Sequence, residues 1–238
     1  MTKIIHRFMK LPYPKAIGGD GPYILGEDGK RYIDAASGAG VSCLGYSDKA
    51  ISDAICKQSH DLAYVYNAYF TTEPAEQLAE SLIDLSPNGL DWVFFGSGGS
   101  ESMDGALKMA LQYFVDKDEP QRHRFIARKQ SYHGCTVGAL SISGNLARRS
   151  LYEEFLPETH HISPCYEYRD RLNHETPEQY GLRVAKELED KIIELGPDSV
   201  AAFIAEPVVG ATGGCIPPVK GYFKEIRRIC DKYGVLLI

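Results

Sequence analysis

A glycine-rich turn between an apolar run and a helical pattern is the feature most suggestive of chemistry in this sequence. Phe94-Phe95 precede Gly96-Ser97-Gly98-Gly99-Ser100, and the helical pattern opens directly after them. Glycines let the backbone approach a phosphate, and the first N–H groups of a helix have no partner within the helix. Hydrogen bonds from such groups to a charged oxygen contribute ~1.5–3 kcal/mol each, whereas the helix dipole contributes only ~0.3–1 kcal/mol. The turn therefore predicts an anion-binding cradle.

The sequence of this turn has three other interpretations. A P-loop requires Gly-Lys-Ser/Thr at the helix start, but the first lysine here is Lys108, well inside the helix. A dinucleotide fingerprint requires a third glycine where this chain has Glu101, so it remains only an alternative. An ordinary glycine-rich connection without a ligand is the simplest alternative.

Two further polar segments follow predicted strands. Tyr132 and His133 come after the apolar run 124–127, and Glu206 follows the run 200–205. Because ligands in open α/β sheets bind beyond the carboxyl ends of the strands, these residues are expected beside the glycine-rich turn. Taken singly, Tyr132 could pack a loop and Glu206 could be solvated, but the order of the three segments favours a site. A Cys135–His133 nucleophile is disfavoured, since neighbours in sequence seldom face each other.

The arrangement of apolar segments predicts an α/β fold, with a mostly parallel sheet flanked by helices and a small N-terminal α+β lobe. The predicted strands of the sheet are short apolar runs at 92–95, 124–127, 200–205 and 235–238. The predicted helices are 47–60, 73–86, 176–196 with a capping box at its start, and 221–233 with Gly234 as its stop. A hairpin is predicted over 22–34. We expect residues 1–70 to form the lobe and 71–238 the sheet domain.

Composition excludes several classes of protein. The net charge of −6, without a basic block, argues against a nucleic-acid surface. The six cysteines form no C-x-x-C pair, so neither a zinc site nor a disulfide framework is indicated. We find no signal peptide and no segment apolar enough to cross a membrane, which leads us to expect a cytoplasmic protein that binds a small molecule.

Taken in order, the three polar segments resemble the class III (subgroup II) aminotransferases, which are pyridoxal-phosphate enzymes of fold type I. The resemblance extends from about Asp34 to Ile238. It is carried by Ser97 to Glu101, by Tyr132 to Ala139 and by Ala202 to Val208, and also by the segments 216–222 and 231–238. The chain is most similar to the branch that acts on ω-amino acids and amines with pyruvate.

The resemblance implies roles for individual residues. Gly98, Gly99 and Ser100 match the positions that hold the phosphate of pyridoxal 5′-phosphate. Tyr132 matches the aromatic residue that stacks on the pyridine ring, and His133 matches the neighbour that supports it. Glu206 matches a supporting catalytic carboxylate near the phenolic oxygen of the cofactor.

The first third of the chain is expected to contribute to a substrate pocket and to a homodimer. Val41, Ser42 and Tyr69 are the residues expected to line the pocket, which would take a small-molecule amino donor and a keto acid. The aromatic residues among 64–70 fit a dimer interface that closes the active site, as in the family. Packing under an ordinary loop is the alternative.

The chain departs from the family pattern near its end. The Schiff-base lysine and the aspartate that pairs with the pyridinium nitrogen match no position here, and Lys129 and Lys220 lie outside the Schiff-base motif. The final run, 235–238, has the pattern of a central strand, so we expect the sheet domain to be truncated there and the chain to be the N-terminal portion of a transaminase, inactive alone. An aminomutase, racemase or decarboxylase of the same fold, and a non-catalytic fragment packing on a complete protomer, remain alternatives.

Overall fold

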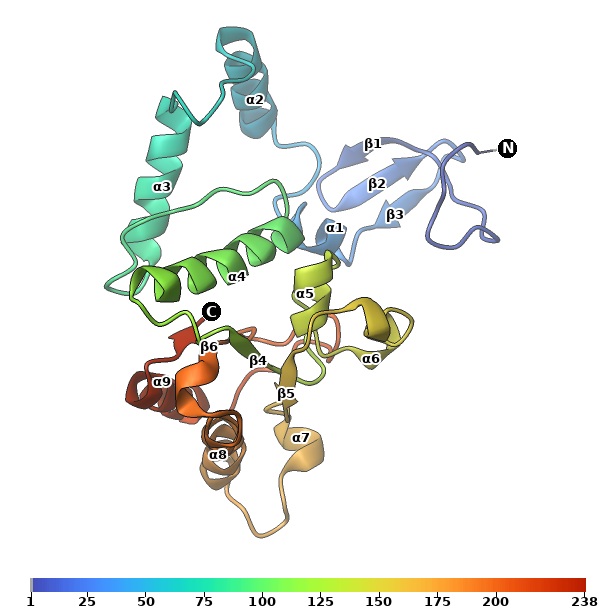
Figure 1. Ribbon diagram of the computed structural model, residues 1–238. Coiled ribbons are helices and arrows are strands. Elements are labelled where there is room, and N and C mark those ends of the chain that lie inside the picture. The colour runs from blue at the N-terminus through green and yellow to red at the C-terminus, as the bar shows by residue number, and fades with distance from the viewer. Residues whose placement is uncertain (1) are drawn as a thin grey trace. The chain divides into compact units, whose positions relative to one another are not determined.

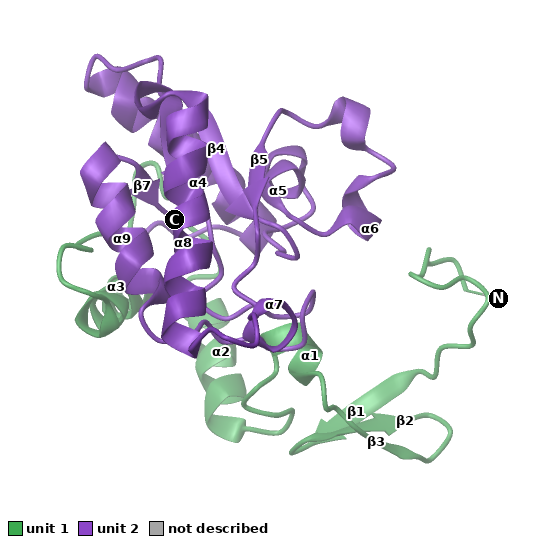
Figure 2. Cartoon of the chain, turned by 90° about the horizontal axis from the view of Figure 1, so that it is seen from below, with its two compact units in different colours: residues 1–93 green, residues 94–238 purple. Residues whose placement is uncertain are grey.

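The computed structural model describes residues 2–238, which form two compact units that span residues 2–93 and 94–238 (Figure 2). The domain boundary expected between residues 70 and 71 stays a prediction. No helix among residues 2–238 is both long and apolar enough to cross a membrane. Within the same residues, no group of three or more His, Cys, Asp or Glu side chains is placed to hold a metal ion.

The first unit contains a three-stranded antiparallel sheet followed by helices. Its elements are β1 (Ala16–Asp20), β2 (Tyr23–Gly26), β3 (Arg31–Ile33), α1 (Ser37–Gly40), α2 (Lys49–Asp61) and α3 (Glu73–Leu85). The predicted hairpin is confirmed as β2 and β3, and its turn contains Gly29 at φ +75°. Asp48 caps α2, because its carboxylate accepts hydrogen bonds from the N–H groups of Ala50 and Ile51.

The second unit contains a parallel sheet with helices on both faces (Figure 1). Its strands are β4 (Arg124–Arg128), β5 (His160–Ile162), β6 (Val200–Phe203) and β7 (Leu236–Leu237), in the spatial order β5-β4-β6-β7. Its α-helices are α4 (Gly99–Asp116), α5 (Val137–Ile142), α6 (Leu146–Arg149), α7 (Glu167–Asp170), α8 (Pro177–Leu195) and α9 (Tyr222–Tyr233). Short 3₁₀ turns lie at η1 (Glu153–Phe155) and η2 (Pro197–Ser199). The predicted α/β architecture is confirmed.

Strand β4 shows how the sheet separates two hydrophobic clusters. Phe125 and Ala127 belong to a cluster with α4 and α5, whereas Ile126 belongs to the cluster with α8 and α9. This alternation follows from the two-residue period of a strand. Because Arg128 follows the same alternation, it points with Ile126 toward the α9 face, where its guanidinium contacts Tyr222 and Phe223.

The helix-end signals in the sequence are confirmed. In α8, the Thr176 hydroxyl accepts from the N–H of Gln179 and the Gln179 side chain accepts from the N–H of Thr176, which is the predicted capping box. Gly196 follows α8 at φ +91°, and Gly234 follows α9 at φ +66°. Glycine is suited to both positions because left-handed backbone costs it least.

The strand prediction at residues 92–95 is wrong. No strand pairs with this segment in the described part of the chain, and Trp92 is 94% exposed. An apolar run forms a strand only where a neighbour satisfies its backbone groups. The run 235–238 does form a strand, and Leu236–Leu237 lies half-buried at the edge of the four-stranded sheet. Two strands lack the apolar pattern used for prediction, namely β1, which contains two glycines, and β5, which begins with two histidines.

Candidate active site

The carboxyl ends of β4 and β6 flank the point where the strand order reverses, which we call the crevice. From β4 the chain continues to β5 on one side, whereas from β6 it continues to β7 on the other side. Ligands of open α/β sheets bind at such a switch point. The main-chain ladder between the two strands ends with the bond from Ile204 N–H to Ile126 O at 2.9 Å. The two segments then pair with their outer neighbours, through Lys129 N–H to Ile162 O at 2.9 Å and Ala205 N–H to Ile238 O at 3.0 Å.

Two of the predicted site residues meet across this crevice. The main-chain N–H of Tyr132 donates to Glu206 Oε2 at 3.3 Å, over 74 positions of sequence. The other carboxylate oxygen, Oε1, accepts from the N–H of Gly210 at 3.4 Å. The Glu206 carboxylate is thus oriented by main-chain donors from both sides. The expectation that the two strand ends come together is confirmed, while the catalytic role of Glu206 stays a prediction.

The glycine-rich turn opens a long helix, as its sequence predicted. Helix α4 begins at Gly99, Gly98 is its N-cap residue, and no side chain caps the first turn. A Cβ built on Gly99 would meet no other atom within 4 Å, so the space in front of this turn is open. Free N–H groups beside open space are what an anion requires.

The loop after β4 is fastened to this turn. The N–H of Cys135 donates to Ser100 Oγ at 2.9 Å, and the hydroxyl of Thr136 donates to Ser100 O at 3.3 Å. Gly134 lies between Tyr132 and Cys135 in the sequence and adopts φ +140°. A Cβ at this residue would lie 2.8 Å from the Cα of Ser100. The loop can approach the helix this closely because residue 134 has no side chain. All six residues predicted for the cofactor site therefore lie on segments of one compact unit.

His133 is buried beneath this loop as a neutral imidazole. Its main-chain N–H donates to Ser143 Oγ at 2.8 Å, whereas its ring atom Nε2 is buried without a hydrogen-bond partner among the described residues. Burial lowers the pKa of His133 to about 4, and the positive charge of Arg128 acts in the same direction. Cys135 contacts Ser100, with Sγ 3.6 Å from Oγ, so the geometry offers no support for a Cys–His nucleophile.

Tyr132 is half-buried, and its ring is held by a cation–π contact. The guanidinium of Arg148, from α6, lies 4.5 Å from the ring centroid. Such a contact contributes ~0.5–1 kcal/mol at an exposed site. It positions the aromatic ring that the sequence predicted as a stacking surface.

The predicted pocket residues Val41, Ser42 and Tyr69 belong to the first unit. The side chains of Val41 and Tyr69 are largely exposed, and the Ser42 hydroxyl donates to Asp34 Oδ2 at 3.1 Å. Ser42 also lines a small cavity of about 270 Å³ together with Asp34 and Tyr46. Their part in binding a substrate stays a prediction.

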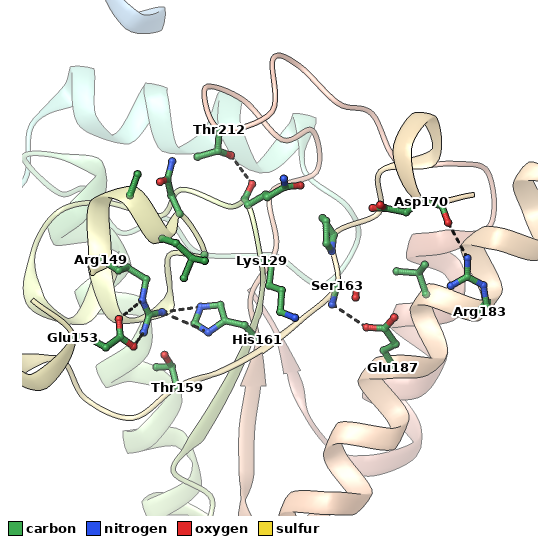
Figure 3. Close-up of a pocket in the computed structure, with 17 residues that line it drawn as sticks. Lys129, Arg149, Glu153, Thr159, His161, Ser163, Asp170, Arg183, Glu187 and Thr212 are labelled. Atoms are coloured by element: carbon green, nitrogen blue, oxygen red, sulfur yellow. Dashed lines mark hydrogen bonds and ion pairs between the residues drawn. The ribbon is translucent and has the colours of Figure 1, made fainter. Parts of the chain in front are cut away.

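A cavity of about 880 Å³ in the second unit contains none of the predicted site residues (Figure 3). Figure 3 shows Lys129 between the Arg149–Glu153 pair and Glu187. Most charged groups of its lining are already engaged: Arg149 pairs with Glu153 at 2.9 Å, and Glu187 accepts from Ser163 N–H at 2.9 Å. The predicted site residues thus do not line this cavity, and a site at the crevice stays a prediction.

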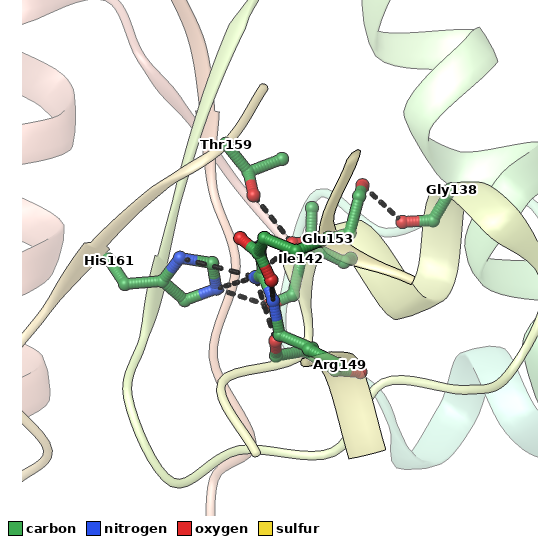
Figure 4. Close-up of polar contacts among 8 residues, drawn as sticks. Gly138, Ile142, Arg149, Glu153, Thr159 and His161 are labelled. Carbon is green, nitrogen blue, oxygen red and sulfur yellow. Dashed lines mark hydrogen bonds and ion pairs between the residues drawn. The ribbon is translucent and has the colours of Figure 1, made fainter. Parts of the chain in front are cut away.

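Arg149, which lines that cavity, makes several structural contacts (Figure 4). Its buried guanidinium donates to Ser141 O at 2.6 Å and Ser143 O at 3.0 Å, and it lies 3.0 Å from His161 Nε2. These bonds satisfy carbonyl groups at the end of α5, which have no partner within the helix. Arg149 thereby supports the segment that contains Ser143, the residue that binds the main chain of His133.

Comparison with known proteins identifies the family. A family model described as aminotransferase class-III matches residues 9–238. The chain belongs to the class-III aminotransferases. It is 47% identical over 224 residues to an uncharacterized aminotransferase of Schizosaccharomyces pombe, covering 94% of this chain and 49% of that protein. It is 37% identical over 221 residues to the putrescine–pyruvate aminotransferase of Pseudomonas aeruginosa, covering 92% of this chain and 48% of that protein.

Solved structures of this family confirm the predicted fold. The omega transaminase from Pseudomonas jessenii in complex with PMP superposes with a TM-score of 0.92 at 33% identity, over 98% of this chain and 53% of that one. An omega-aminotransferase from Paracoccus denitrificans superposes with a TM-score of 0.91 at 32% identity, over 99% of this chain and 54% of that one. This class-III aminotransferase chain thus spans about half the length of the relatives it matches. Family membership implies pyridoxal 5′-phosphate as the cofactor.

Proposed function

We propose that this chain is the N-terminal portion of a pyridoxal-phosphate-dependent transaminase, which transfers an amino group from an amine or ω-amino acid to a keto acid such as pyruvate. Family membership supports amino transfer. The omega-transaminase structures and the putrescine–pyruvate relative support the choice of donor and acceptor classes. The observation that carries the proposal is the crevice in which Glu206 and Tyr132 are joined, together with the open first turn of α4 in the same unit.

The residues of this unit fit the cofactor. Gly98, Gly99 and Ser100 would hold its phosphate, because the turn offers free N–H groups and the space in front of Gly99 is open. Tyr132 would supply a flat surface for its ring. When bound, pyridoxal phosphate supplies an electron sink for the carbon that loses a proton.

The two polar side chains of the crevice would act by charge and orientation. The Glu206 carboxylate is fixed by the N–H groups of Tyr132 and Gly210, so it would meet the cofactor in one orientation. His133 would support Tyr132 as an uncharged group, since burial keeps its pKa at about 4. An uncharged His133 would add no positive charge to that of Arg128 and Arg148 near the crevice.

We also propose that the Schiff-base lysine and the pyridinium-pairing aspartate lie in further sequence, because they match no position in these 238 residues. The relatives, at about twice the length, are consistent with this proposal. It follows that the 238-residue chain alone would be inactive. A homodimer and a cytoplasmic location are further parts of the proposal, and the former is tested by the molar mass of the full-length protein in solution.

The test is amino transfer by the protein expressed from its full reading frame. Purified protein is given pyridoxal phosphate, pyruvate and either putrescine or an ω-amino acid, and alanine formation is measured. Alanine formed only in the presence of both donor and pyruvate is the expected result. Release of carbon dioxide, or an isomerised amino acid without alanine, would instead assign a decarboxylase, racemase or aminomutase. Cofactor binding without any turnover of these compounds would favour the non-catalytic alternative.

A further inference from the structure

We propose that Arg128 is a positioning residue of the crevice, which holds Glu206 opposite Tyr132 by bonding to the main chain on both sides of the opening. The inference rests on the proposed function, in which the crevice binds the cofactor. Arg128 lies just after the apolar run 124–127 and is not among the residues predicted for the site.

The guanidinium of Arg128 bridges the place where the sheet opens. Arg128 is the last residue of β4 and is 2% exposed, and its Nη2 donates to the main-chain oxygen of Glu206 at 2.5 Å. The main-chain ladder between β4 and β6 has already ended at Ile126 and Ile204. A side-chain bond therefore continues the connection between the strands after the main-chain bonds have stopped.

The main chain of Arg128 holds the other side of the crevice. Its carbonyl oxygen accepts from the hydroxyl of Ser131 at 2.7 Å, and Ser131 Oγ in turn accepts from the N–H of Gly144 at 2.9 Å. Ser131 directly precedes Tyr132. One residue thus anchors Glu206 through its side chain and the turn that leads to Tyr132 through its carbonyl group.

Packing alone does not account for an arginine at this position. No carboxylate pairs with Arg128 among residues 2–238, and its Nε has no hydrogen-bond partner there. The guanidinium lies over the rings of Tyr222 at 5.9 Å and Phe223 at 5.7 Å, within an otherwise apolar cluster. A buried charge without a counter-ion is costly, so an apolar side chain would fill this space at lower cost in stability. What an apolar side chain cannot provide is the bond to Glu206 and the positive charge beside His133.

The first test is hydrogen exchange in the full-length protein without cofactor. R128M removes the guanidinium, and the Tyr132 amide should lose at least about tenfold of its protection because Glu206 is no longer held as its acceptor. R122M is the matched control. Arg122 is also buried and donates to main-chain oxygens, those of Pro197 at 3.0 Å and Tyr233 at 3.2 Å, but it precedes β4 at the opposite end of the strand. R122M should lower global stability and leave the protection of Tyr132, relative to that of the sheet, unchanged.

The second test is a thermodynamic cycle on the dissociation constant of pyridoxal phosphate. E206A should weaken binding about tenfold in the wild-type background but less than about threefold in the R128M background, since coupled residues are not additive. E206A should keep its full effect in the R122M background. If R128M does not fold, R128K serves in both tests, because it keeps a positive charge but has a shorter reach to Glu206.

The inference would be overturned if E206A weakened cofactor binding by the same factor in the wild-type and R128M backgrounds. It would also be overturned if the Tyr132 amide kept its protection in a folded Arg128 variant. Failure of the proposed function has a different signature, namely a wild-type full-length protein that does not bind pyridoxal phosphate. The exchange experiment is carried out without cofactor and still decides the role of Arg128 in that case.

Discussion

The hydroxyl oxygen of Ser100 accepts a hydrogen bond from the main-chain N–H of Cys135 at 2.9 Å, which joins the first turn of α4 to the loop that contains Tyr132. The predicted phosphate-binding turn and the loop of the predicted stacking residue are therefore joined directly by hydrogen bonds. A substitution in either segment should affect cofactor binding, and the way in which it does so distinguishes the roles.

Gly99→Val should weaken the binding of pyridoxal phosphate to the full-length protein by more than about tenfold. The new side chain would occupy the open space in front of the helix, where nothing lies within 4 Å of an added Cβ. The dissociation constant is measured by absorbance titration and the stability by urea unfolding. Gly105→Ala adds a Cβ to the same helix away from its first turn and should leave affinity unchanged. Wild-type affinity in Gly99→Val would remove the phosphate assignment.

Tyr132→Ala should loosen the cofactor by about tenfold and slow turnover, because a stacked pair of rings contributes ~0.5–1.5 kcal/mol beyond the area it buries. The phosphate cradle should remain, so binding should not be lost entirely. Tyr132→Phe keeps the ring and should retain most of the affinity. Unchanged binding and rate in the alanine variant would make Tyr132 an ordinary packing residue.

His133 should make stability fall as the pH decreases from 6.5 toward 4. Burial lowers the pKa of His133 from 6.5 to about 4 in the folded state. Between pH 6.5 and pH 4 the imidazole is therefore protonated in the unfolded chain but not in the folded protein. The contribution of the neutral His133 to the free energy of unfolding is complete above pH 6.5, and it should decrease by about 2 kcal/mol between pH 7 and pH 5. His133→Asn should remove this part of the pH dependence of urea unfolding. An identical loss of stability in the variant and the wild type would contradict the assignment.

Gly134→Ala should destabilise the protein more than Gly214→Ala does. Both glycines have positive φ, +140° and +78° respectively, so both substitutions introduce backbone strain. Only at position 134 would the Cβ also clash, at 2.8 Å from Ser100 Cα, whereas nothing lies within 4 Å at position 214. The clash should add ~1–3 kcal/mol to the loss in unfolding free energy. Equal losses in the two variants would show that the loop and the helix are not tightly packed.

The 238-residue polypeptide alone should show no transaminase activity and no specific lysine that retains a pyridoxyl group after borohydride reduction. Protein from the full reading frame should show transaminase activity and one lysine that retains a pyridoxyl group. Mass spectrometry of reduced peptides is the measurement. A pyridoxyl group on Lys129 or Lys220 of the shorter chain would assign the Schiff base to that lysine.

Local signals in the sequence predicted much of the second unit. The capping box at Thr176, the stop at Gly234 and the apolar runs of β4 and β6 each depend on a few neighbouring residues, and the structure confirms all of them. The strand prediction for residues 92–95 was wrong because strand formation depends on a distant partner that a local pattern cannot identify.

The site was predictable in its segments but not in its contacts. The positions of Tyr132 and Glu206 at strand ends follow from the strand pattern, whereas the strand order that makes β4 and β6 neighbours cannot be derived from either strand alone. Arg128 was missed because a charged residue at the end of a strand usually faces solvent. The one signal that could have drawn attention to it is the period of β4, which places it on the same face as Ile126.

The distance in sequence between Tyr132 and Glu206 has a consequence for folding kinetics. Their bond spans 74 positions, and the bridge from Arg128 to Glu206 spans 78. Parallel pairing of such remote segments is slow, because the entropy of closing the intervening chain is lost before the contacts form. The crevice should thus be among the last parts of this unit to assemble, and a cofactor that recognises it would bind chains that have already folded rather than guide them there.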